Sequence, residues 1–221
     1  MSNKIGTTEP KKLYIRVDEQ WWQPWANTLL YLPFTSDMLD HSWNNRVVTT
    51  DIGIIQNGYF YNDNTDTNSR WFTIQNMPAL TNFTTTFYEK KTWTYANNQQ
   101  AVFLYAGGSQ IHSIDFANKI RFGVWGWPND PSVPNNWADV WRLLTYVKNG
   151  NNFSFYINAT LISSASRAWV SQPAWSHYYF WWGSVYYPLM WYASQLIVED
   201  KARTAQEVSD YYNLTKWNYW L

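Results

Sequence analysis

Alternation of apolar and polar residues with a period of two is the feature that most constrains this chain. Residues 153–158 (Phe-Ser-Phe-Tyr-Ile-Asn) and 120–124 (Ile-Arg-Phe-Gly-Val) place apolar side chains at every second position. Successive side chains of a strand point to opposite faces, so this spacing predicts strands with one buried face. Further segments are predicted as strands on similar grounds: 29–34, 83–88, 102–105, 141–147 and 195–198.

The connections between these segments are polar and contain turn residues. Stretches rich in Asn, Asp, Ser and Pro occupy 62–69, 97–100, 128–136 and 148–152. The pair Asn149-Gly150 lies between two predicted strands, and Asn-Gly is a preferred sequence for a tight β-hairpin. Many short strands joined by polar turns predict an all-β sandwich.

One segment near the C-terminus predicts a helix instead. Thr204 and Glu207 have the spacing of a capping box, in which the hydroxyl and the carboxylate satisfy the first free N–H groups of a helix. Val208, Tyr211 and Tyr212 then fall on one face, and the helix is expected over about 205–215. A helix this short is not stable alone, so we expect it to dock on the sandwich.

The first 27 residues are predicted to form a separate N-terminal β-arm. Residues 11–17 resemble a strand, 18–19 a turn and 20–22 a returning strand, after which Pro24 leads into the main domain. A two-stranded piece is marginal by itself, so it is expected to pack on another chain or on the sandwich. We therefore divide the chain into an arm, residues 1–27, and one sandwich domain, residues 28–221.

Composition excludes several classes of protein. Sixteen basic and 16 acidic residues give a net charge of zero, which argues against a nucleic-acid-binding surface. No segment approaches the ~20 apolar residues that a membrane span needs. Cysteine is absent, which excludes disulfides, a thiolate nucleophile and a Cys-based zinc site. Residues 1–12 contain no apolar run after a basic region, so we expect no secretory signal.

Four segments, in order, resemble the concanavalin A-like jelly roll in its laminin-G-like branch. They are 27–34 with the turn 40–45, then 58–74, then the hairpin 141–158 with its Trp141 and Asn158, and finally 196–198 with 202–213. The resemblance covers about residues 27–216. It implies a concanavalin A-like jelly-roll β-sandwich that ends in a short C-terminal helix.

The N-terminal arm resembles a short module that precedes such domains in bacteriophage virion proteins. Residues 4–22 match its pattern of Lys, Ile, Tyr and Val followed by Trp. This resemblance implies a tail or head-decoration component that attaches to other virion proteins through the arm, as a homo-oligomer. The expected location is the virion, or otherwise the extracellular space or a cell surface.

Tryptophan is frequent and glycine is rare. The chain has 17 Trp and nine Gly, where roughly 15 Gly are usual for this length. Several turn-like settings favour φ > 0, which glycine supplies and tryptophan does not. The jelly-roll resemblance implies glycine at six positions where this chain has another residue: Arg16, Trp43, Ala159, Trp191, Trp217 and Trp220. Either the tryptophans are genuine and sit in rearranged turns or an adhesive surface, or several occupy glycine sites, for example through a recoded UGA codon.

The sequence contains no recognisable catalytic constellation. A related branch of the jelly roll contains glucanases with an E-x-D-x-x-E strand, and no such run is present. The acidic pairs are interpreted as turns, caps and solvated edges: Asp37/Asp40, Asp63/Asp66, Glu207/Asp210 and Glu199-Asp200. His41, His112 and His177 lack the spacing of a metal site, and nucleotide-binding or nucleophile-elbow motifs are missing. We therefore expect no enzymatic activity and no organic cofactor.

A calcium site is the one metal site that the sequence suggests. Residues 62–68 (Asn-Asp-Asn-Thr-Asp-Thr-Asn) are dense in the oxygen ligands that Ca²⁺ prefers. They lack the glycine and the terminal Glu of an EF-hand, and a polar loop is expected there in any case. Some laminin-G-like domains bind calcium at the rim, so the resemblance adds support. Asp63 and Asp66 are the candidate ligands.

The long connection at 125–137 is the predicted carbohydrate site. Its candidate ligand-binding residues combine indole rings with an amide and a carboxylate: Trp125, Trp127, Asn129, Asp130 and Trp137. Sugars stack their C–H faces on indole, while Asn and Asp bond their hydroxyls. Long connections in compact domains are often functional. Alternatively, Trp125 and Trp127 are core or subunit contacts, since aromatic anchors also favour protein interfaces.

Together with these patterns, the two resemblances imply a non-enzymatic phage virion structural or decoration protein. Its lectin-like sandwich is expected to contact host surface glycans or neighbouring subunits. The alternatives are a free carbohydrate-binding lectin and, against the missing carboxylate pattern, a glycan hydrolase.

Overall fold

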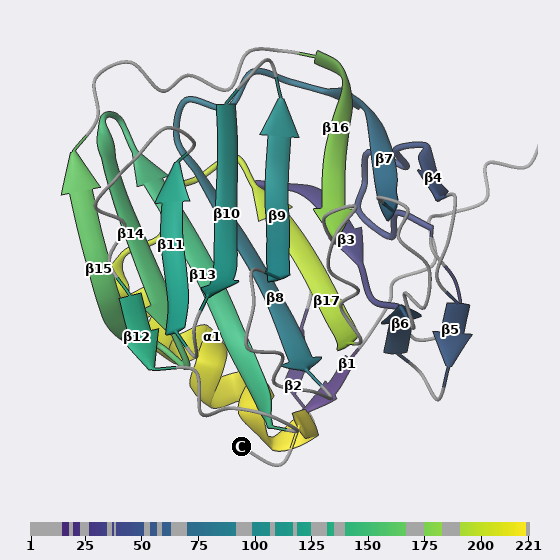
Figure 1. Cartoon of the computed structure of the whole chain (residues 1–221). Coiled ribbons are helices and arrows are strands. Elements are labelled where there is room, and N and C mark those ends of the chain that lie inside the picture. The colour runs from purple at the N-terminus through teal and green to yellow at the C-terminus, as the bar shows by residue number, and fades with distance from the viewer. Residues whose placement is uncertain are drawn as a thin grey trace, which may run out of the picture.

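The computed structural model of the chain describes residues 15–17, 20–22, 27–34, 37, 39–50, 54–56, 59–62, 70–91, 99–106, 109–116, 119–124, 132–134, 140–166, 175–182 and 191–219. These residues form two large antiparallel sheets, a separate two-stranded sheet and one α-helix near the C-terminus (Figure 1). The predicted all-β sandwich with a short C-terminal helix is confirmed.

One sheet has seven strands and is built mainly from the middle of the chain. In order across the sheet they are β12 (Ser132–Pro134), β11 (Lys119–Val124), β10 (Ser109–Phe116), β9 (Gln99–Ala106), β16 (Trp175–Trp182), β7 (Arg70–Met77) and β4 (Val48–Thr50). The four strands β9 to β12 are consecutive neighbours, whereas β16 inserts between β9 and β7. Sequentially distant segments therefore lie side by side (Figure 1).

The second sheet has eight strands, and β17 pairs with three of the others. In order they are β15 (Thr160–Ser166), β14 (Asn152–Ile157), β13 (Trp141–Asn149), β8 (Phe83–Lys91), β17 (Trp191–Glu199), β6 (Tyr59–Asn62) and β5 (Ile54–Gln56), while β3 (Thr28–Leu32) also pairs with β17. β17, which comes late in the chain, therefore pairs with three strands that come earlier: β8, β3 and β6.

The main core lies between the two sheets, and alternate residues of the eight-stranded sheet face it. In β13, Leu144 and Tyr146 belong to this core together with Ile74 and Met77 of β7, whereas Leu143 belongs to a second cluster on the opposite face. All these side chains are buried. Successive side chains of β13 thus point to opposite faces, as predicted. Both faces of this strand are buried, however, and not one alone.

A β-bulge in β17 changes which side chains face the core. The register against β8 shifts between Ser194 and Ile197, and Gln195 has a φ of 53°. As a result Ala193 and Leu196, three positions apart, both belong to the core between the sheets, and Ile197 faces the other way. An extra residue in one strand produces this reversal.

The helix covers the face of the eight-stranded sheet that the seven-stranded sheet does not cover. Helix α1 spans Ala205–Thr215 and continues into the 3₁₀ helix η1 (Lys216–Tyr219). Thr204 is its N-cap and both bonds of the predicted capping box with Glu207 are present. The ring of Tyr219 stacks on that of Tyr88 at 3.7 Å between centroids, so the docking expected from the sequence is observed.

The turn at residues 40–46 covers the free edge of β3. Oδ1 of Asp40 accepts hydrogen bonds from the N–H groups of Tyr31 (3.0 Å) and Ser42 (2.8 Å), and Oδ2 accepts from the N–H of Arg46 (2.8 Å). The side chains of Arg46 and Ser42 donate to the carbonyl of Leu29. Unpaired edge groups invite association with other chains, and here side chains satisfy them.

Two predicted hairpins are present, one after β13 and one in the N-terminal arm. Gly150, between β13 and β14, has a φ of 57°, in agreement with the expected Asn-Gly turn. In the arm, β1 (Ile15–Val17) pairs with β2 (Gln20–Trp22). The division of the chain into an arm and a sandwich domain stays a prediction.

The backbone does not require glycine at the two exposed indoles Trp43 and Trp217. In the turn around Trp43, positive φ falls on Asn45 (44°), and Trp217 lies within η1, so the expectation of φ > 0 at these two positions is wrong. Ala159 does adopt a positive φ of 62°. Trp220 lies outside the described residues. Whether these tryptophans are genuine stays open, and UGG codons at Trp43 and Trp217 would exclude recoding there.

Candidate functional site

The residues that the sequence suggested as ligands lie outside the described part of the chain. This holds for the carbohydrate candidates Trp125, Trp127, Asn129, Asp130 and Trp137 and for the calcium candidates Asp63 and Asp66. Residues 125–130 come between β11 and β12 in the sequence, and Trp137 follows β12. The single long connection expected at 125–137 is therefore interrupted by β12 (Ser132–Pro134), the edge strand of the seven-stranded sheet. The calcium candidates follow β6. Both sites stay predictions.

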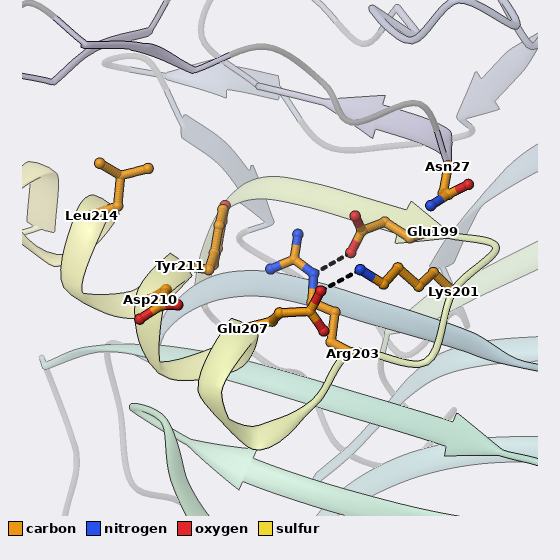
Figure 2. A pocket seen from close by; sticks show the side chains of 8 residues that line it. All are labelled: Asn27, Glu199, Lys201, Arg203, Glu207, Asp210, Tyr211 and Leu214. Carbon is orange, nitrogen blue, oxygen red and sulfur yellow. Dashed lines mark hydrogen bonds and ion pairs between the residues drawn. The ribbon is translucent and has the colours of Figure 1, made fainter.

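A polar cleft beside helix α1 is the candidate site among the described residues (Figure 2). Its volume is about 440 Å³. It is lined by side chains from the start of β3, the end of β17, the connection to α1 and the helix itself: Asn27, Glu199, Lys201, Arg203, Glu207, Asp210, Tyr211 and Leu214.

The inner wall of the cleft is a buried ion pair between Glu199 and Arg203. Nε of Arg203 lies 2.5 Å from Oε2 of Glu199, and the two side chains are 3% and 2% exposed. Five residues separate the last strand from the helix, so this connection folds back and brings the i, i+4 pair together. Burial raises the pKa of the Glu199 carboxyl above its usual range, and the neighbouring guanidinium opposes that shift.

Several contacts hold the Arg203 guanidinium in place. It lies over the ring of Tyr211, 4.9 Å from its centroid, and the Tyr211 hydroxyl donates to Oε1 of Gln195 (3.2 Å). The backbone N–H of Arg203 donates to the hydroxyl of Thr84 (2.9 Å). Gln195, at the bulge, therefore helps to position Tyr211, which lines the cleft and packs against Arg203.

The rim carries a second, partly exposed pair. Lys201 forms an ion pair with Glu207, whose other oxygen accepts from the backbone N–H of Thr204 (2.8 Å). These hydrogen bonds, that from Lys201 foremost, lower the pKa of Glu207 to about 2. Further along the helix, Asp210 accepts from the side-chain amide of Gln206 (2.7 Å).

The cleft is suited to hydrogen-bonding a ligand. It contains three carboxylates and two cationic groups, and each carboxylate already has a donor of this chain. No group of three or more His, Cys, Asp or Glu side chains that could hold a metal ion occurs among the residues described. His41 hydrogen-bonds Asp37 (2.9 Å) in a turn away from the cleft lining.

The sequence interpretation missed Glu199. It was expected at a solvated edge, but it is 1% exposed and paired. The spacing of Glu199 and Arg203 was visible in the sequence, but an i, i+4 pair is informative only within a helix, and these residues lie before one. The interpretation of Glu207 as a cap residue is confirmed.

Comparison with known proteins identifies relatives by structure only. No protein-family model and no curated protein sequence matches the chain. The binding domain of Paraclostridial mosquitocidal protein 1 superposes with a TM-score of 0.66 at 15% identity, over 85% of this chain and 52% of that one. The binding domain of botulinum neurotoxin DC, in complex with rat synaptotagmin II, gives 0.65 at 13% identity, over 85% and 51%.

A third match is botulinum neurotoxin type C, which depends on interaction with two ganglioside molecules to enter cells. Its TM-score is 0.64 at 14% identity, over 85% of this chain and 51% of that one. This chain therefore spans about half the length of each of these neighbours. At such low identity the likeness establishes a shared β-sandwich fold. Within the described part of this chain, no helix is long and apolar enough to span a bilayer.

Proposed function

We propose that this protein is a non-enzymatic recognition module whose sandwich binds carbohydrate on a cell surface. The observation that carries the proposal is the likeness of the sandwich, over 85% of the chain, to domains that bind receptors. One of those neighbours interacts with gangliosides and another with a protein, synaptotagmin II. Each neighbour is about twice as long as the matched part, so ligand binding by this half alone is part of the proposal.

Carbohydrate is the favoured ligand class because of the side chains that the chain offers. The connection at 125–137 combines indoles with Asn and Asp, which suit the C–H faces and hydroxyls of sugars. Asp63 and Asp66, in the polar stretch 62–68, are the residues that would hold calcium.

The arm adds a second part to the proposal. Residues 4–22 resemble a module of bacteriophage virion proteins, so we propose that the arm attaches the sandwich to a virion and to neighbouring subunits. Multiple copies on one particle would convert weak affinity for each sugar into strong overall attachment.

A glycan array with the full chain tests carbohydrate recognition. We expect binding that falls about two- to tenfold in Trp125→Ala, Trp127→Ala or Trp137→Ala, since one aromatic stacking contact contributes roughly 0.5–1.5 kcal/mol. Trp217→Ala is the matched control, because it removes an exposed indole (66% exposed) that does not belong to residues 125–137. An array that stays blank at millimolar affinity contradicts the proposal. Loss of binding on calcium chelation, reproduced by Asp63→Asn, supports the calcium site.

A deletion of residues 1–25 tests the role of the arm. The deleted protein should retain the sandwich and its glycan binding but no longer attach to purified virions of the phage that encodes it. Unchanged attachment contradicts the role of the arm. Glycan binding by a chain that attaches to no particle identifies a free lectin.

A further inference from the structure

The cleft beside α1 has the size and the wall chemistry of a small-molecule site. Its volume of about 440 Å³ lies within the range of ligand pockets, roughly 300–1,000 Å³. The described residues that line it come from the start of β3, the end of β17, the connection after β17 and helix α1.

Two of the three carboxylates in the cleft are already paired with cations of the chain, and the third is hydrogen-bonded by an amide. Glu199 is paired with Arg203, Glu207 with Lys201, and Asp210 is hydrogen-bonded by Gln206. An anionic ligand would meet three carboxylates against two cations, and a cationic ligand would have to share carboxylates with the two cations. An anionic ligand is therefore disfavoured, and a cationic ligand finds only Asp210 without a cationic partner, at an exposed position where solvent screens its charge.

A neutral ligand with many hydroxyls meets no such obstacle. A carboxylate has about four acceptor positions, so a hydroxyl can donate to it while the present donor stays in place. Lys201 and Asn27 carry several N–H donors for hydroxyl oxygens. Leu214, half-buried on the helix, offers an apolar wall for the C–H face of a ring.

The inner wall is also held in place before any ligand arrives. Arg203 is packed over Tyr211 and paired with Glu199, and its backbone is bonded to Thr84. A site whose polar groups are already ordered loses less conformational entropy on binding.

We propose that this cleft is a second ligand site, which takes a neutral sugar of one or two rings. The inference rests on the proposed function as a carbohydrate-recognition module and assigns to it a site separate from residues 125–137. The site uses the helix side of the molecule, where Glu199, Arg203 and Asp210 line the wall.

Ligand-observed NMR with the full chain tests the assignment. The probes are neutral glucose, galactose and their disaccharides, anionic N-acetylneuraminate and cationic glucosamine. We expect saturation transfer to at least one neutral sugar, and weaker or no transfer to the two charged sugars.

Three helix variants locate the binding. Asp210→Trp places an indole in the cleft from an exposed position of the helix. It should weaken neutral-sugar binding by at least about tenfold, because the indole and a sugar cannot occupy the cleft at the same time. Asn213→Trp adds the same side chain at an exposed position outside the lining and should bind as the unchanged chain does. Asp210→Asn, which keeps the shape and removes the charge, should bind more weakly by a few-fold. Circular dichroism checks that all three variants are folded.

The outcomes separate this inference from the proposed function. Absence of neutral-sugar binding, preference for a charged sugar, or unchanged binding in Asp210→Trp overturns the cleft site. If array binding is lost in Trp125→Ala while NMR binding of the neutral sugars is unchanged in Asp210→Trp, the proposed function stands and the cleft site falls. If NMR binding depends on Asp210 while the array is blank, the cleft site stands and surface-glycan recognition falls.

Discussion

Ala159 has a backbone conformation that favours glycine. It has a φ of 62° and follows Asn158 at 48°, so both residues of the turn between β14 and β15 are left-handed. Two-residue hairpins of this kind prefer Asn-Gly, and the jelly-roll resemblance implies glycine here. The Cβ of an L-residue is strained in this region, at a cost of roughly 1–2 kcal/mol.

Ala159→Gly should therefore stabilise the protein by about 0.5–1 kcal/mol, because relief of strain exceeds the added freedom of the unfolded chain. For a chain of this size that corresponds to a melting temperature higher by about 2–4 °C for each kcal/mol, measurable by thermal unfolding. Ala202→Gly, at a residue without positive φ, is the control and should destabilise instead. Equal effects of the two substitutions would contradict the role of the turn.

Glu89 and Arg142 form an ion pair inside the sandwich. They are cross-strand partners in β8 and β13, each 1% exposed, and Nε of Arg142 lies 2.5 Å from Oε1 of Glu89. By alternation they lie on the same face as Phe87 and Leu144, which belong to the core between the sheets. Removing one partner of a buried pair leaves an uncompensated charge.

Arg142→Met is expected to lower the free energy of unfolding by about 3–5 kcal/mol. The double variant Glu89→Leu with Arg142→Met should recover most of that loss, because neither charge of this pair then remains in the core. Urea denaturation of the four proteins of this cycle measures the coupling. Losses that simply add would show that the pair does not act as a unit.

At the scale of the element, the helix depends on its first turn. The capping box of Thr204 and Glu207 satisfies free N–H groups, and Lys201 pairs with the same carboxylate. The pKa of Glu207 is lowered from 4.5 to about 2. A lowered pKa means that the carboxylate stabilises the folded state above its unfolded pKa and that this contribution is lost as the pH falls through the folded value.

Glu207→Gln should therefore be less stable than the unchanged chain at pH 7 and equally stable near pH 2. We expect a difference of about 1 kcal/mol at pH 7, because the side chain is 37% exposed and solvent screens its interactions. Urea denaturation across this pH range measures it. A difference that stays constant with pH would assign the loss to something other than the charge.

At the scale of the whole molecule, the eight-stranded sheet is covered on both faces. The seven-stranded sheet closes one face, and α1 with η1 covers the other through Val208, Tyr211 and Tyr219. Tyr31, Tyr88 and other side chains beneath the helix are fully buried. The helix is thus part of the fold, whereas β1 and β2 pair with each other in a separate sheet.

For this reason, two truncations should differ in their effect on stability. A chain that ends after Arg203 exposes Tyr31, Tyr88 and Ile197 and should lose its cooperative unfolding transition, since burying each such side chain contributes about 1.5–3 kcal/mol. A chain without residues 1–25 should melt within about 2 °C of the full chain. Differential scanning calorimetry measures both. A stable chain without the helix would contradict this account of the covered sheet.

Local patterns predicted most of the elements because their causes are local. The period of two in 153–158 corresponds to β14, the Thr204–Glu207 box to the start of α1, and Asn149-Gly150 to a hairpin. Left-handed φ at Trp43 and Trp217 was not predicted correctly, because neighbouring residues decide which member of a turn takes that conformation.

The candidate cleft could not be predicted because its residues meet only in three dimensions. Glu199 has the sequence surroundings of a surface carboxylate, and only the packing of the helix against β17 buries it beside Arg203. The bulge that turns Gln195 toward Tyr211 also has no local signal, since it depends on the register with β8.

The sequence alone thus determined the fold class, the capped helix and the main hairpins, since propensity, alternation and capping act over a few residues. Only the tertiary structure decided the strand order, the coverage of both faces of one sheet and the cleft beside α1. Strand order and buried pairs depend on contacts between segments far apart in the chain, such as β17 with β3, β6 and β8. Those contacts form only when the two sheets and the helix bury their apolar faces together.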